Sequence, residues 1–174
     1  LEFRRVLFRS QLHSLTPLAR LRLLREVHCY GSHLNDDAVN ALAELPELQS
    51  MGIELPTPAC MKRLGKLGAK LRKLAMRNQD GLRPDSLNSA RDWESIAQFE
   101  QLEQLTLMNL IAIDASTLRA LAALPRLKVF HVSGSITEEE RAQLRRYTSA
   151  DIDAFRQARP NVELHIDGKE YPAN

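Results

Sequence analysis

Apolar residues recur in one short pattern at six places along the chain. In a clear copy, Leu45 is followed by Leu48, Met51 and Ile53, which are three, six and eight positions further on. The copies begin at Leu21, Leu45, Gly68, Phe99, Leu124 and Ala158. A unit that returns at this spacing is typical of a solenoid, in which stacked units share one core.

Each copy also predicts its own secondary structure. Its last two apolar positions alternate with polar or small residues, which favours a short strand with two inward side chains. Helix starts are predicted at Asn35, at Pro58 after Thr57, at Asp114, at Thr137 with Glu140 as a capping box, and at Thr148 or Ser149. The repeated order of strand, loop and helix predicts a parallel sheet with all helices on its outer side.

The third unit is longer than the others. Residues 81–98 predict a loop and a helix that carries Leu87, Ile96 and Trp93, the only tryptophan of the chain. We expect these side chains to form a hydrophobic plug beneath the helix. An inserted binding loop is the alternative interpretation.

The first ten residues differ in character from the rest. No initiator Met precedes them, and in one reading frame a short-read sequencing adapter translates to the same decapeptide. We therefore interpret residues 1–10 as adapter-derived and not native. Residues 11–174 are expected to form one leucine-rich domain that is truncated at its N-terminus.

If residues 1–10 are not native, the net charge of the chain has to be counted without them. The formal net charge is +2, and Arg4, Arg5 and Arg9 against Glu2 account for all of it. The remainder is neutral, so the basic isoelectric point is no evidence for binding nucleic acid or membranes.

Composition narrows the class further. The chain is 44% hydrophobic, but none of its apolar runs approaches the roughly 18 residues of a membrane span. Cys29 and Cys60 both fall at apolar positions, which predicts buried thiols in a reducing compartment and hence a cytoplasmic location. A reactive thiol, the alternative, requires an exposed electropositive site.

Two stretches carry a family resemblance. Residues 34–53 and 113–132 each combine an acidic helix start, Ala-Leu-Ala, and Leu-Pro-x-Leu leading into a strand. They resemble leucine-rich repeat proteins of an irregular bacterial or cysteine-containing-like subtype, and residues 158–167 resemble the unit that closes such arrays. The resemblance implies an α/β solenoid of about six units, with a parallel sheet on the concave face and helices on the convex face.

The chain departs from the family pattern at one place. Many members carry an asparagine five residues after the seventh-position apolar residue, which forms a ladder between neighbouring turns. Here those positions hold Ser32, Pro56, Gln79, Leu110 and Ser135. We therefore expect an irregular array.

Stacked strands would align their outward side chains on the concave face. The candidate protein-binding residues there are Glu26, His28, Tyr30, Glu54, Lys73, Arg77, Gln104, Thr106, Met108, His131, Ser133 and His165. Tyrosine and arginine are enriched at binding hot spots, and methionine adapts to its partner. The mixture lacks the basic stripe or stacking platform that nucleic acid favours. An ordinary solvated strand surface is the alternative.

His131 and His165 are expected to lie side by side. A metal or catalytic site would need a third ligand or a placed nucleophile, and neither follows from the sequence. Phosphate-binding, zinc-binding and nucleophile-elbow motifs are also missing. We therefore predict no catalytic residue, no metal, no cofactor and no enzymatic activity.

The sequence thus favours a monomeric protein–protein interaction module that binds an unidentified protein partner, and neither nucleic acid nor membrane. One alternative is the targeting module of a larger enzyme, of kinase or ubiquitin ligase type, whose catalytic domain lies upstream. Another is a structural spacer without a partner.

Overall fold

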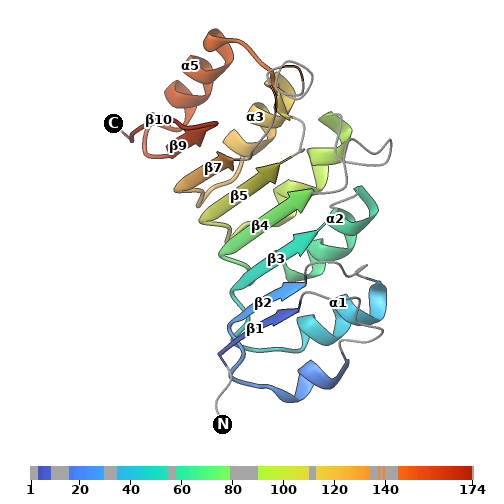
Figure 1. Ribbon diagram of the computed structural model, residues 1–174. Helices are drawn as coiled ribbons and strands as arrows, with labels where there is room; N and C mark the ends of the chain where they lie inside the picture. Colours follow the sequence, from blue (N-terminus) through green and yellow to red (C-terminus); the bar gives the residue numbers. More distant parts are fainter. Residues whose placement is uncertain are drawn as a thin grey trace.

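The computed structural model describes residues 4–8, 16–29, 35–54, 58–78, 90–109, 113–133, 137, 139 and 145–173. Its main feature is an eight-stranded sheet with the order β1-β2-β3-β4-β5-β7-β9-β10 (Figure 1). These strands span Arg5–Phe8, Glu26–Cys29, Ser50–Glu54, Lys73–Asn78, Gln104–Asn109, Val129–Ser133, Glu163–Ile166 and Lys169–Tyr171. All neighbouring pairs are parallel except β9 and β10. The chain is therefore α/β with a mostly parallel sheet, as predicted.

Helices lie along one face of this sheet (Figure 1). The α-helices are α1 (Asp36–Ala43), α2 (Pro58–Leu64), α3 (Ala115–Ala122) and α5 (Ser149–Ala158). Three 3-10 helices, η1 (Thr16–Arg20), η2 (Gly65–Leu67) and η3 (Ala90–Gln98), accompany them. A small parallel pair joins β6 (Ile113–Asp114) to β8 (Arg145–Arg146). None of the helices in the described ranges is long and apolar enough to cross a membrane.

Capping residues explain where the helices begin. The Asn35 side chain accepts a hydrogen bond from the Ala38 amide at 2.8 Å, and Asp114 accepts one from the Thr117 amide at 2.8 Å. Thr148 caps α5 and forms a capping box with Asp151. The predicted starts of α1, α2, α3 and α5 are confirmed. Glu140, the second half of the other predicted capping box, lies outside the described residues.

The hydrophobic core lies between the sheet and the helices, and both contribute side chains to it. The inward strand residues Val27, Cys29, Met51, Ile53, Leu74, Met76, Leu105, Leu107, Phe130, Val132, Leu164 and Ile166 are all buried. This confirms the alternation that predicted them. Trp93 and Ile96 are buried beneath η3, which confirms the hydrophobic plug, whereas Leu87 lies outside the described residues.

The last unit differs from the prediction at one position. The copy that begins at Ala158 puts Asn161 at an inward site three residues further on, but Asn161 is exposed and Val162 is buried instead. The Val162 amide donates to the Arg159 carbonyl at 3.1 Å in a turn directly after α5. The register of β9 is as predicted, with Leu164 opposite Phe130 and Ile166 opposite Val132, so only the apolar residue before the strand is shifted.

The first sheet edge also differs from expectation. With residues 1–10 interpreted as not native, the strand around Val27 would be an open apolar edge. In the structure, β1 pairs with β2 in parallel, with Val6 opposite Val27. The apolar residues of Arg5–Phe8 suit a strand, and Val6 packs against the core. The pairing does not bear on the origin of residues 1–10, which stays a prediction.

Two long cationic side chains tie neighbouring units together. Lys70 Nζ donates to the carbonyl of Ala43 and, at 3.0 Å, to that of Leu45. The Arg159 guanidinium donates to the carbonyls of Ala122, Leu124, Pro125 and Leu127. Carbonyls at and after the ends of α1 and α3 thereby gain partners that the helices cannot supply. The positions of the missing asparagine ladder lie outside the described residues.

Burial makes the Cys29 thiol unreactive. Desolvation raises its pKa from 9.0 to about 12, and the thiolate is the reactive form. At pH 8 we expect iodoacetamide to modify native Cys29 about 1,000-fold more slowly than the urea-unfolded chain, following the thiolate fraction. Mass spectrometry of the Cys29 peptide in a Cys60→Ala variant would measure both rates. Equal rates would show that the thiol is accessible.

Candidate functional site

The candidate site is the open face, by which we mean the outward side chains of β2, β3, β4, β5, β7 and β9 on the side of the sheet opposite the helices. Strand register aligns these side chains in three rows. The rows are Glu26, Ser50, Lys73, Gln104, Val129 and Glu163; His28, Gly52, Ala75, Thr106, His131 and His165; and Glu54, Arg77, Met108 and Ser133. The structure therefore brings together all the predicted binding residues except Tyr30, which lies outside the described residues.

Several charges on the β2–β4 part of the open face are paired, one of them with Arg5 of β1. Glu26 Oε1 lies 2.5 Å from His28 Nε2 and 3.4 Å from Arg5 Nε. Across the next strands, Arg77 Nε lies 3.8 Å from Glu54 Oε1. Glu54 is largely buried and Arg77 partly so. The pair lies next to Met108, which is opposite Arg77 in register.

The opposite end of the open face carries two histidines. The His131 and His165 rings lie 5.5 Å apart between centroids, which confirms that they are neighbours. Glu163 Oε1 lies 2.5 Å from His165 Nε2, and Glu170 Oε1 lies 3.8 Å from Nδ1. Burial, followed by the nearby His165, lowers the pKa of His131. His131 is therefore a neutral imidazole at neutral pH.

The described residues around the histidine pair do not define a metal centre. In the part of the chain that the structure describes, there is no group of three or more His, Cys, Asp or Glu side chains that could hold a metal ion. The expectation of no metal, no cofactor and no catalytic residue stays a prediction.

A charged rim borders the open face where the strands begin. Glu103 bridges two units, at 3.3 Å from Arg72 Nη1 and 2.7 Å from Lys128 Nζ. The hydrogen bond from Lys128 is the largest effect that lowers the pKa of Glu103. A groove of about 350 Å³ here is lined by Arg25, Glu26, Gln49, Ser50, Arg72, Lys73 and Glu103. This rim was not predicted from the sequence, although its residues each directly precede a strand, namely Arg25, Gln49, Arg72, Glu103 and Lys128.

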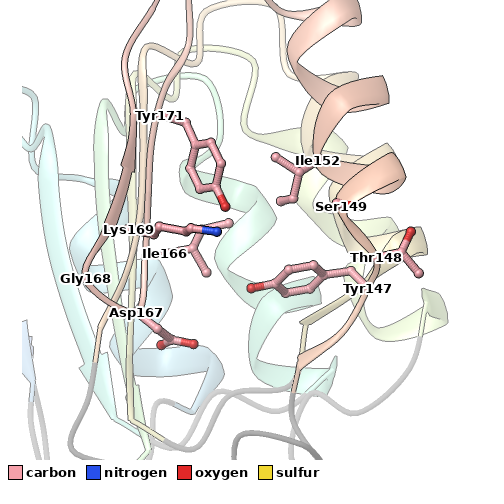
Figure 2. A pocket seen from close by; sticks show the side chains of 9 residues that line it. All are labelled: Tyr147, Thr148, Ser149, Ile152, Ile166, Asp167, Gly168, Lys169 and Tyr171. Carbon is pink, nitrogen blue, oxygen red and sulfur yellow. The ribbon is translucent and has the colours of Figure 1, made fainter.

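A second feature absent from the sequence analysis is a cavity at the β10 end of the sheet. It has a volume of about 430 Å³ and lies between α5 and the β9–β10 hairpin (Figure 2). Tyr147, Thr148, Ser149, Ile152, Ile166, Asp167, Gly168, Lys169 and Tyr171 line it. The Asp167-Gly168 dipeptide was the available signal, because Asp-Gly favours a tight hairpin turn.

The architecture is similar to a solved structure of the leucine-rich repeat class. It matches TLR13 in the crystal structure of the TLR13–ssRNA13 complex with a TM-score of 0.54 and 18% sequence identity. The match covers 91% of this chain and 22% of the TLR13 chain, so this chain spans about a fifth of that structure. At this identity the likeness concerns the fold alone. No protein-family model and no curated protein matches the sequence.

In that complex, TLR13 is bound to single-stranded RNA. The expectation that this chain does not bind nucleic acid therefore stays a prediction and needs its own test.

Proposed function

We propose that this chain is part of a leucine-rich repeat array of about six units, with the sheet on its concave face, and that the array is a protein–protein interaction module. The observation that supports the proposal is the open face itself. Six neighbouring parallel strands present three aligned rows of side chains on the face away from the helices. A solenoid of this kind offers an extended surface rather than a catalytic pocket.

The chemistry of the open face favours a protein partner. Arg77 and Met108 are neighbours in register at its centre, and arginine and methionine are both enriched in protein interfaces. The acidic residues Glu26, Glu54 and Glu163 are spread over the same face, which opposes a phosphate backbone. We propose that Arg77 and Met108 anchor the partner and that the polar neighbours set its register.

A cytoplasmic monomer is also part of the proposal. Its support is the pair of free, buried cysteines, Cys29 and Cys60, which suit a reducing compartment. The alternative, a targeting module of a larger enzyme, would bind its partner through the same open face. The two functions differ only in whether a catalytic domain is attached to the module.

The test is partner capture with a matched pair of variants. The full chain is immobilised, and captured proteins are identified by mass spectrometry. We expect Arg77→Ala with Met108→Ala to reduce capture about tenfold or more, because a few anchors dominate interface energy. Arg119→Ala with Gln157→Ala changes the exposed helix layer instead and should leave capture unchanged. Circular dichroism confirms that both variants are folded.

Two outcomes would contradict the proposal. Equal capture by the two double variants would remove the open face as the binding surface. Salt-dependent binding of labelled single-stranded RNA, measured by fluorescence anisotropy and stronger than capture of any protein, would favour a nucleic-acid function instead.

A further inference from the structure

The cavity at the β10 end exists because the chain reverses there. Asp167 and Gly168 have φ angles of 48° and 81°, which is the left-handed conformation required by a two-residue hairpin turn. The turn makes β10 antiparallel to β9. The short β9–β10 hairpin and the N-terminal half of α5 border an open cavity of about 430 Å³ (Figure 2).

Lys169 occupies an unusual position in this hairpin. It is opposite Ile166 in register, and Tyr171 is opposite Leu164. Ile166 and Leu164 are buried core residues, so Lys169 and Tyr171 lie on the helix side of the sheet. Alternation calls for an apolar residue at position 169, and the sequence places an ammonium group there. A polar residue that breaks the local pattern marks a functional candidate.

Tyr147, Ile152, Ile166 and Tyr171 supply the apolar and aromatic part of the lining, beside the polar residues Thr148, Ser149 and Asp167. Figure 2 shows Lys169 and Tyr171 from the hairpin, and Tyr147 and Ile152 from the segment at the start of α5, directed into the same space. Ile152 and Ile166 are buried and form its floor. Lys169 Nζ lies 5.8 Å from the centroid of the Tyr171 ring. An aromatic or aliphatic group could therefore be enclosed next to a positive charge.

Lys169 is the one cation among the residues that line the cavity. Asp167, the one carboxylate of the lining, is engaged by Arg145, with oxygen–nitrogen distances of 2.8 and 3.0 Å. Among the described residues, no ion pair involves Lys169. Just outside the lining, the Arg156 guanidinium carbon lies 6.0 Å from the centroid of the Tyr171 ring. The lining therefore presents one ammonium group to an anionic ligand, which matches a monoanion.

We propose that this cavity binds a ligand composed of an apolar or aromatic body and one carboxylate. The carboxylate pairs with Lys169, and the body packs between Tyr147 and Tyr171 above Ile152 and Ile166. Two sources share this chemistry, namely the C-terminal residue of a peptide and a free aromatic carboxylic acid. The proposal is independent of the open face, which lies on the other side of the sheet.

The test uses two probes that differ only in charge. Binding of N-acetylphenylalanine and of N-acetylphenylalaninamide to the full chain is measured by NMR chemical-shift titration. We expect the acid to bind with a Kd of about 1 mM, as is usual for a ligand of this size, and at least about fivefold more tightly than the amide. Shifts should centre on the residues that line the cavity.

A matched pair of lysine variants tests whether Lys169 is the group that binds the carboxylate. Lys169→Gln should weaken acid binding about fivefold and leave amide binding unchanged, because only the ion pair is lost. Lys62→Gln removes an exposed lysine from α2 and should change neither probe. Circular dichroism establishes that both variants are folded.

A tetrapeptide ending in phenylalanine separates the two sources. Tighter binding of its free-acid form than of N-acetylphenylalanine identifies a peptide C-terminus, and equal binding identifies the small acid. The proposal is overturned if acid and amide bind equally, if Lys169→Gln has no effect, or if neither probe shifts the cavity residues at about 10 mM.

Discussion

Replacing Trp93 by alanine is expected to lower the free energy of unfolding by about 3–5 kcal/mol, the range found for large aromatic truncations in cores. The Trp93 side chain is only 1% exposed, in the 3-10 helix η3 that packs against α2 and α3. Removing it leaves a void that this short helix, held on both sides, cannot close. Urea unfolding followed by far-UV circular dichroism measures the change, since the variant has lost the only tryptophan.

The matched control for Trp93 is Glu100→Ala. Glu100 is exposed just beyond η3, so we expect its replacement to change stability by less than about 0.5 kcal/mol. Trp93→Phe should fall between the two, because it keeps part of the packing. A Trp93→Ala effect as small as that of Glu100→Ala would show that η3 is not part of the cooperative core.

Replacing Arg145 by methionine is the second change with a large expected effect. Arg145 and Asp167 form a bidentate ion pair whose side chains are 5% and 10% exposed. Methionine keeps the length of the side chain but leaves the Asp167 carboxylate buried without its arginine. Breaking a buried pair on one side costs about 3–5 kcal/mol, mostly through the uncompensated charge. Urea unfolding measures the loss.

A double-mutant cycle distinguishes this explanation from a loss of packing. Asp167→Asn keeps a residue that tolerates the left-handed turn conformation. In the Arg145→Met background, Asp167→Asn should recover part of the stability, because the buried charge is gone. Strictly additive effects of the two substitutions would mean that the pair is not energetically coupled.

Most of the fold could be predicted because alternation and spacing are local properties of the sequence. The inward positions from Val27 to Val132 and the caps at Asn35, Asp114 and Thr148 all follow from patterns a few residues long. In the last unit the same reasoning failed by one residue at Asn161. There the turn after α5 decides which residue before β9 is buried, and the repeat pattern contains no information on the length of that turn.

The candidate site was less accessible to prediction. Register between strands follows from the repeats, so the rows that contain Arg77, Met108 and His131 could be anticipated. The cavity beside Lys169 could not, since it depends on the hairpin that reverses the chain after Ile166. A prediction that ended the array at Asp167 assigned no role to Lys169 and Tyr171. Neither the repeat pattern nor the strand register can predict which residues of the open face contact a partner.

The two carbonyl-binding cations, Lys70 and Arg159, have a consequence for how the array loses its structure. Each spans the boundary between two successive units, and it meets several backbone oxygens of the earlier unit. In a linear array, stability is a sum of unit terms and nearest-neighbour terms. These two boundaries therefore carry stronger nearest-neighbour coupling than packing alone provides. Local unfolding that starts at either end of the array would therefore proceed by groups of units. It would pause at the boundaries that Lys70 and Arg159 stabilise, instead of releasing one strand at a time.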